Sequence, residues 1–284
     1  MTIVVTGATG HLGRLIIEAL LRGGTPAADI VAAGRSVEKL DDLADRGVRV
    51  ARIDFADPAS LAAAFDGADA LMLVSGSEVG QRAAQHANAI DAARKAGVTR
   101  IVYTSAPGAT TSALVLAPEH KATEEYLQAS GVPFTVLRNN WYHENYEQSV
   151  QQAAATGVLA SSVGGGLIAS AARADYADAA AAVLVGDGHD GRTYELAGDE
   201  AWSQEEFAAA IAEASGRPVV YTALSPEEHL AMLNSAGLDE GTAGFVVALD
   251  GNARDGLLAG GSGELSALIG RPTTPLRDWL ATQF

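Results

Sequence analysis

A glycine-rich segment near the start of the chain, TGATGHLG at residues 6–13, constrains the fold more than any other feature. It follows a short apolar run and precedes a segment with helical periodicity, so it marks a turn between a strand and a helix. Gly7 permits a tight turn, Gly10 lets the backbone approach a pyrophosphate without a Cβ in the way, and Gly13 lets the helix lie close to the strand. The N–H groups at the start of such a helix favour an anionic ligand. The alternative is a glycine-rich turn of purely structural origin.

Short apolar runs alternate with longer helical segments through the first half of the chain, which predicts repeated βαβ units. Hydrophobic residues make up 48% of the chain but aromatic residues only 6%, as is typical of helices packed on a parallel sheet. The predicted class is therefore α/β, a doubly wound parallel sheet of the Rossmann type with a smaller C-terminal α/β lobe. The strands are expected at residues 3–6, 30–33, 48–53, 70–74, 100–104 and 134–137.

The second half of the chain carries its own helix and strand signals. Ser203 with Glu206, and Ser225 with Glu228, predict helix starts with capping boxes, and Thr274 is expected to cap the last helix. The expected division is a nucleotide-binding domain at residues 1–156 and a smaller substrate-side lobe at 157–284. Within that lobe, residues of about 168–198 are expected to return to the main sheet, with a strand at 193–197.

Composition excludes several classes of function. The net charge of −16, from 19 basic against 35 acidic residues, opposes binding to nucleic acid and to an anionic membrane surface. The chain has no cysteine, so disulfides, thiolate catalysis and thiolate metal sites are absent, and the scattered histidines suggest no metal cluster. The first residues lack the pattern of a signal peptide, and we expect a cytoplasmic protein.

The residue that follows the second expected strand bears on the choice of cofactor. An acid about twenty residues beyond the glycine loop would bind the ribose 2′-hydroxyl of NAD, but the strand here ends in Ala33, Gly34 and Arg35. A guanidinium pairs with a 2′-phosphate, whereas a carboxylate repels it. Arg35 therefore predicts a preference for NADP(H), the alternative being an ordinary solvated arginine.

Two further segments end predicted strands at the edge where open α/β sheets bind ligands. The small residues Ser75, Gly76 and Ser77 follow the fourth strand and suit a backbone that approaches a cofactor, although a plain turn explains them equally well. Asp54 ends the third strand, where it can face the adenine or cap a turn.

With these residues in place, the chain resembles the NmrA-like, atypical branch of the short-chain dehydrogenase/reductase superfamily. Within it, the chain is most similar to the NADPH-dependent quinone oxidoreductase type 2 subgroup, which is related to triphenylmethane reductase. The resemblance covers nearly the whole chain and rests on TGATGHLG, Arg35, SGSEVGQRAAQH, LRNNWYHENY, IASAARADYADAA and YELAGDEAW. It implies a Rossmann fold that binds NADPH and passes a hydride to a quinone or a similar conjugated acceptor.

The resemblance also implies a set of cofactor contacts, with the nicotinamide near Asn139 and Asn140. By position they fall on Gly7, Ala8, Thr9, Gly10, His11, Leu12, Arg35, Ser75, Gly76, Ser77, Asn139, Asn140, Trp141, Tyr142 and Arg173.

The usual catalytic pair of this superfamily, a Tyr four residues before a Lys, is incomplete. Lys121 occupies a plausible lysine position, but Ala117 stands four residues before it. The missing acid fits a quinone acceptor, because the reduced product is a phenolate-like oxyanion that needs less stabilisation than an alkoxide. The hypothesis is that Asn140 and Lys121 hydrogen-bond the acceptor oxygen, the alternative for Lys121 being a solvated helix lysine.

The aromatic residues that follow Asn140 are expected to form part of a flat substrate pocket. Trp141, Tyr142 and His143 are placed against the substrate, and the alternative is that they are core residues. A second function is also open, because NmrA-like relatives include sensors that hold NADP(H) and regulate a protein partner without turnover. Superfamily habit implies a homodimer or a tetramer, and no stretch of the sequence identifies the interface.

Overall fold

The computed structural model of the chain describes residues 1–78 and 80–284, which divide into two units. The first unit comprises Met1–Thr110, Leu116–Asn139 and Arg173–Glu195. The second comprises Thr111–Val115, Asn140–Ala172 and Leu196–Phe284. The chain thus enters the second unit after Asn139, before the boundary expected at residue 156, because the intervening helix packs on elements of the second unit.

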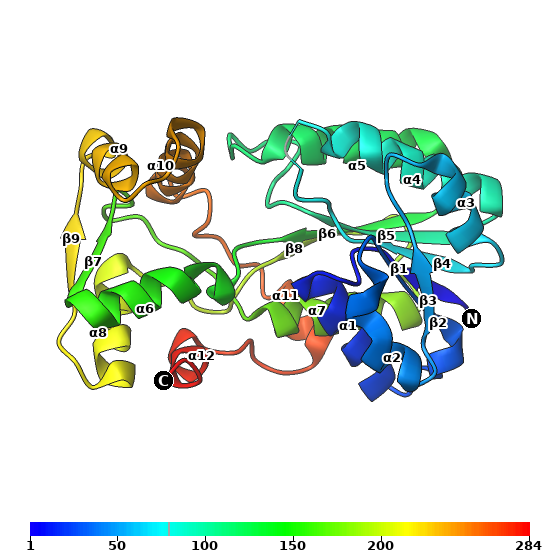
Figure 1. Cartoon of the computed structure of the whole chain (residues 1–284), viewed down its shortest axis with the longest axis horizontal. Helices are drawn as coiled ribbons and strands as arrows, with labels where there is room; N and C mark the ends of the chain where they lie inside the picture. The colour runs from blue at the N-terminus through cyan, green and yellow to red at the C-terminus, as the bar shows by residue number, and fades with distance from the viewer. Residues whose placement is uncertain (79) are drawn as a thin grey trace. The chain divides into compact units, whose positions relative to one another are not determined.

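A parallel sheet forms the centre of the first unit (Figure 1). Its strands run in the order 3-2-1-4-5-6-8, the doubly wound order in which the connections reverse beside β1. The central strands are apolar and buried along their length, as expected for a sheet covered on both faces. In spatial order the strands are β3 (Arg49–Arg52), β2 (Ile30–Gly34), β1 (Ile3–Val5), β4 (Ala70–Leu73), β5 (Arg100–Ser105), β6 (Phe134–Asn139) and β8 (Thr193–Leu196).

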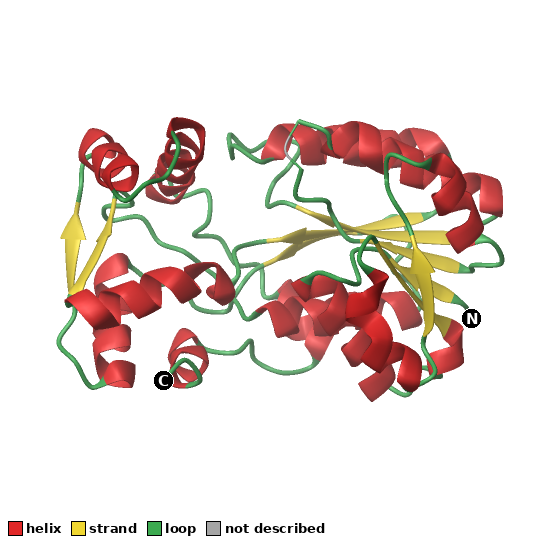
Figure 2. Cartoon of the chain, in the orientation of Figure 1, coloured by secondary structure: helices red, strands yellow, loops and turns green. Residues whose placement is uncertain are grey.

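Helices cover both faces of this sheet (Figure 2). One face carries α3 (Pro58–Phe65), α4 (Arg82–Ala96) and α5 (Ala117–Ser130), which lie side by side. The other face carries α1 (His11–Arg22) and α7 (Arg173–Val185), and α2 (Asp41–Asp45) leads into β3. The last strand of the sheet comes from late in the chain, because β8 is the neighbour of β6.

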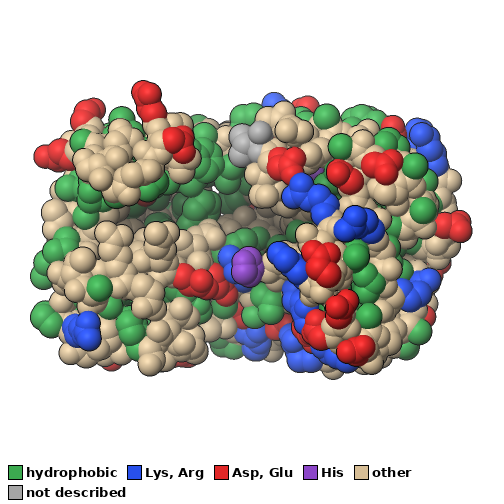
Figure 3. Space-filling view, in the orientation of Figure 1, with side chains coloured by type: hydrophobic (Ala, Val, Ile, Leu, Met, Phe, Trp, Pro, Cys, Tyr) green, Lys and Arg blue, Asp and Glu red, His purple; other side chains and the backbone are tan. Residues whose placement is uncertain are grey.

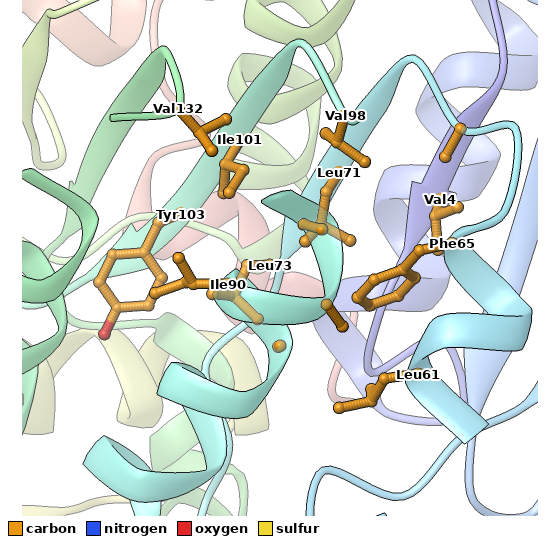
Figure 4. Packing of buried hydrophobic residues seen from close by; sticks show 14 of the residues in the cluster. Val4, Leu61, Phe65, Leu71, Leu73, Ile90, Val98, Ile101, Tyr103 and Val132 are labelled. Atoms are coloured by element: carbon orange, nitrogen blue, oxygen red, sulfur yellow. The ribbon is translucent and has the colours of Figure 1, made fainter. Parts of the chain in front are cut away.

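The apolar core of the first unit lies between the strands and the layer of α3, α4 and α5. Phe65 of α3 lies beside Val4 of β1 (Figure 4), and Leu61 and Leu71 belong to the same buried cluster. Tyr103 places its ring against this core with its hydroxyl directed away from it. A polar group therefore emerges at the edge of an otherwise apolar cluster.

The second unit contains a short parallel sheet of β7 (Val158–Ser161) and β9 (Val220–Ala223). Both capping boxes are confirmed, since Ser203 and Ser225 accept from the backbone N–H groups of Glu206 and Glu228. Thr274 is not the cap of the last helix, because that helix starts one residue later than expected, with Pro275 at the N-cap position and no side-chain cap. The helices are α6 (Glu147–Thr156), α8 (Gln204–Ser215), α9 (Pro226–Ser235), α10 (Glu240–Arg254), α11 (Glu264–Ile269) and α12 (Leu276–Ala281).

Candidate functional site

A pocket in the first unit opens at the carboxyl ends of the central strands, where β1 and β4 adjoin. This is the point at which the strand order reverses and at which doubly wound sheets bind their ligands. Its walls come from the glycine loop, the ends of β2, β3 and β4, and the start of α7. The lining residues are Gly7, Thr9, Gly10, His11, Leu12, Gly13, Gly34, Arg35, Ile53, Asp54, Phe55, Val74, Ser75, Gly76, Ser77, Glu78, Gln85 and Arg173.

The glycine loop has the geometry of a phosphate-binding turn. Gly7 adopts a φ of +63°, which favours glycine, and a Cβ on Gly13 would lie 2.6 Å from the carbonyl carbon of Gly7. Gly10 is the N-cap of α1, has no side-chain cap, and is followed by a first turn with no acidic residue. The N–H groups at this helix start are therefore available for an anion, and the dipole of α1 favours negative charge there.

Arg35 follows β2 and reaches Glu78, which follows β4. The guanidinium Nη1 lies 2.6 Å from Oε1 of Glu78, and Gln85 donates to the other carboxylate oxygen at 2.8 Å. These hydrogen bonds, that of Gln85 first, lower the pKa of Glu78 below its usual range. The pocket therefore contains an ionised carboxylate beside the arginine that the sequence assigns to the 2′-phosphate.

A buried histidine fixes the strand end that lines the pocket. Gly76 donates its N–H to Nε2 of His86 at 3.1 Å, so Nδ1 carries the proton and donates to Thr123 at 3.0 Å. Burial lowers the pKa of His86 to about 3, with the Arg82 cation adding to the effect, and the ring is neutral at physiological pH. Arg82 also donates to the carbonyl of Gly76 at 2.8 Å. Both backbone polar groups of Gly76 are thus held by buried side chains.

A second polar cluster lies at the carboxyl ends of β5, β6 and β8. Arg138 binds Glu124 in a bidentate manner at 2.6 and 3.0 Å and Glu195 at 2.8 Å. Ser105 donates to Glu124 at 2.6 Å. The two carboxylates raise the pKa of Arg138, that of Glu124 first, and this network ties α5 to β5, β6 and β8.

The surrounding surface of the first unit carries paired charges. On the face shown in Figure 3, basic and acidic side chains are interspersed over α1 and α2. Arg46 binds Glu18 at 2.6 Å, and Arg14 pairs with Asp42.

No helix in the described ranges 1–78 and 80–284 is long and apolar enough to cross a membrane.

Comparison with known proteins decides the family. The family model described as NAD(P)H-binding matches residues 7–186, a range that includes the glycine loop, Arg35 and most of the first unit. The chain belongs to the NAD(P)H-binding family. The matched range begins within the glycine loop, at Gly7.

Relatives of this NAD(P)H-binding protein include characterised reductases. It is 47% identical over 282 residues to quinone oxidoreductase 2 of Escherichia coli, covering 99% of this chain and 98% of the relative. The crystal structure of the NADPH-dependent quinone oxidoreductase of E. coli complexed with NADPH superimposes with a TM-score of 0.95, covering 99% of both chains. Triphenylmethane reductase of Citrobacter sp. complexed with NADP(H) is 37% identical, with a TM-score of 0.95 and full coverage of both chains. The resemblance inferred from the sequence is confirmed.

Most of the expected cofactor residues of this family member meet in the one pocket described above. Gly7, Thr9, Gly10, His11 and Leu12 line it together with Arg35, Ser75, Gly76, Ser77 and Arg173. Ala8 is fully buried and lines a neighbouring depression that also includes Arg14, Lys39 and Arg173. Asp54 caps a turn, accepting from the N–H of Ala56 at 2.9 Å, and also lines the pocket.

The two consecutive asparagines fall in different units. Asn139 ends β6 in the first unit and is buried. Asn140 begins a stretch of the second unit, and its side-chain N–H groups donate to the carbonyls of Leu258 at 3.0 Å and Ala169 at 3.3 Å. Its Oδ1 is buried with no hydrogen-bond partner in the part of the chain that the structure describes. To donate to an acceptor oxygen, Asn140 must first release a main-chain carbonyl.

The aromatic segment after Asn140 is half-buried and then buried. Trp141 and Tyr142 are partly exposed, and the backbone of Tyr142 bridges to Ala171. His143 is 1% exposed, with Nε2 donating to the carbonyl of Thr274 at 3.0 Å and Nδ1 accepting from Ser170 at 2.8 Å. Both ring nitrogens of His143 are therefore engaged within the second unit.

Lys121 lies on α5, where its side chain is 48% exposed and 3.9 Å from Glu125. It is not among the described residues that line the pocket. Sequence reasoning missed Glu78 and Gln85, although both belong to the string SGSEVGQRAAQH. The available signal was the position of Glu78, directly after the small-residue turn at the end of the fourth strand.

Proposed function

We propose that this protein is an NADPH-dependent oxidoreductase that transfers a hydride to a quinone. The observation that carries the proposal is a single pocket that is lined by both Arg35 and the start of α1, which has no side-chain cap. The amide groups of the glycine loop suit the pyrophosphate, and Arg35 suits the 2′-phosphate. The identity of 47% to quinone oxidoreductase 2 of E. coli supports turnover over a purely sensing role.

The residues of this chain bind and orient, while bound NADPH supplies the hydride. Ala117, at the start of α5, stands where the superfamily usually has its acid, a tyrosine four residues before the lysine. Lys121 therefore lacks that tyrosine. A quinone fits this deficiency, because its reduced oxyanion is delocalised and needs mainly correct placement of the two rings. Trp141 and Tyr142 are proposed to border the acceptor, and the hydrogen-bonding role of Asn140 and Lys121 stays a prediction.

The remaining predictions concern the surroundings of the enzyme. The proposed partner is a small molecule of the size of a quinone. A cytoplasmic location and a homodimer stay predictions from the sequence. A conjugated dye is a second candidate substrate, supported by the 37% identity to triphenylmethane reductase.

The test is NADPH oxidation, followed by absorbance, on addition of a simple quinone or a triphenylmethane dye. We expect quinone-dependent oxidation by the wild type, with a smaller rate for the dye. Tight NADPH binding with no oxidation by any acceptor would favour the sensor instead.

Arg35→Ala tests the cofactor site separately from the chemistry. Loss of one charge-assisted contact should weaken NADPH binding about tenfold to a hundredfold and leave NADH binding within about twofold. Arg277→Ala is the matched control, because Arg277 is equally exposed, at 69% against 67%, and also binds a glutamate at 2.6 Å. Equal NADPH affinities for the two variants would contradict the proposed site.

A further inference from the structure

Two loops that follow different strands place a carboxylate on the arginine of the cofactor pocket. Arg35 comes directly after β2, and Glu78 comes five residues after β4. Their side chains meet at 2.6 Å, and both line the pocket. Gln85 of α4 donates to the second oxygen of Glu78, so each carboxylate oxygen has a partner from a different element. The carboxylate is thus held in place by two contacts.

This position matters because of what an acid does there in related folds. In NAD-binding Rossmann folds an acid at the end of the second strand accepts from the ribose 2′-hydroxyl. Here Arg35 occupies that strand end, but Glu78 brings a carboxylate to the same guanidinium from the neighbouring loop. A group held by Arg35 therefore lies within a few ångströms of this carboxylate, whether it is a hydroxyl or a phosphate.

The two forms of the cofactor respond to such a carboxylate in opposite ways. A 2′-phosphate carries a charge of about −1.5 to −2, so it must compete with Glu78 for Arg35 and is repelled by it. A ribose 2′-hydroxyl can donate a hydrogen bond to the carboxylate and suffers no repulsion.

We infer that Glu78 limits the preference for NADPH that Arg35 provides, lowering the affinity for NADPH and supporting the binding of NADH. The inference rests on the proposed function, because it assumes that the pocket binds the dinucleotide. Arg35 and Glu78 together then form a site that accepts either cofactor, with Arg35 as the partner of the phosphate and Glu78 as the partner of the hydroxyl.

Glu78→Gln is the decisive variant, since it removes the charge, keeps the size of the side chain and exchanges one of the two acceptor oxygens for an NH2 donor. Asp54→Asn is the matched control. Asp54 lines the same pocket, but its Oδ1 accepts from the N–H of Ala56. This control removes one negative charge from the pocket and leaves the pair of Arg35 and Glu78 intact.

Dissociation constants for NADPH and NADH should be measured by fluorescence titration of the wild type and of both variants. We expect Glu78→Gln to bind NADPH about threefold to tenfold tighter and NADH no tighter, whereas Asp54→Asn changes the NADPH-to-NADH affinity ratio by a smaller factor. In an Arg35→Gln background, the effect of Glu78→Gln on the NADPH-to-NADH ratio should shrink toward one.

Two results would overturn the inference in distinguishable ways. An unchanged ratio in Glu78→Gln, with wild-type NADPH binding intact, removes the role of Glu78 and leaves the proposed function standing. Failure of the folded wild type to bind either cofactor removes the proposed function and this inference together. A thermal melt of each variant shows that the compared proteins are folded.

Discussion

Two glycines of the same loop should respond differently to an added methyl group. In Gly13→Ala, the new Cβ would lie 2.6 Å from the carbonyl carbon of Gly7 and 2.9 Å from the nitrogen of Ala8. In Gly10→Ala, the new Cβ would lie 3.3 Å from the carbonyl oxygen of Gly7 and, its chain neighbours aside, within 4 Å of no other atom of the described residues. The first methyl group meets backbone of the protein, and the second faces the space proposed for the pyrophosphate.

The expected stabilities follow from these distances. Carbon atoms pack best at about 3.5–4.0 Å, so Gly13→Ala requires a backbone shift of about 1 Å. Overpacking of this kind costs about 3 kcal/mol, and the higher helix propensity of Ala returns about 1 kcal/mol. The net loss of about 2 kcal/mol corresponds to a Tm lower by about 4–8 °C. Gly10 has φ of −96° and ψ of 172°, which Ala adopts readily, so Gly10→Ala should be as stable as the wild type or slightly more stable.

For cofactor binding we expect the reverse order, with Gly10→Ala affected more than Gly13→Ala. Gly10→Ala should weaken NADPH binding about tenfold or more, because the methyl group holds the pyrophosphate away from the amides of α1. Thermal melts with and without NADPH, together with titration of the cofactor, measure both effects on the same samples. A Gly10→Ala protein that binds NADPH as the wild type does would refute the placement of the pyrophosphate, and an unaltered Tm for Gly13→Ala would refute the steric argument.

Three further predictions concern the polar residues of the first unit. Burial lowers the pKa of both His86 and His120 to about 3, whereas in the unfolded chain they titrate near 6.5, so stability should be full above pH 6.5 and fall as the pH decreases. At pH 5 each histidine accounts for a loss of about 2 kcal/mol, which urea unfolding between pH 5 and 8 would reveal, and a flat profile would contradict it. Arg138→Met leaves Glu124 buried without its cation and should lower the free energy of unfolding by about 3–5 kcal/mol in the same assay. A decrease of less than about 1 kcal/mol would contradict this. Lys121→Met should change kcat of quinone reduction less than about twofold if the exposed lysine is solvated, whereas a loss of about a hundredfold would establish the catalytic role predicted from the sequence.

Local signals in the sequence located much of the fold. Every expected strand of the first half is present within two residues at each end, because short buried apolar runs and helical periodicity are properties of neighbouring residues. The capping boxes at Ser203 and Ser225 formed as expected for the same reason. Thr274 failed as a cap because the chain places Pro275 at the N-cap, a choice that depends on how the preceding loop packs.

The sequence by itself determined a dinucleotide-binding α/β protein, since the spacing of three glycines and the position of Arg35 after a strand are local and carry their chemistry with them. Tertiary structure alone decided which side chains meet. Glu78 lies 43 positions from Arg35 along the chain, and His86 reaches Gly76 only because β4 and α4 fold back on each other. The amide of Asn140 is likewise committed to a carbonyl 118 positions away. Such pairings depend on the packing of distant segments, which no local pattern of residues encodes.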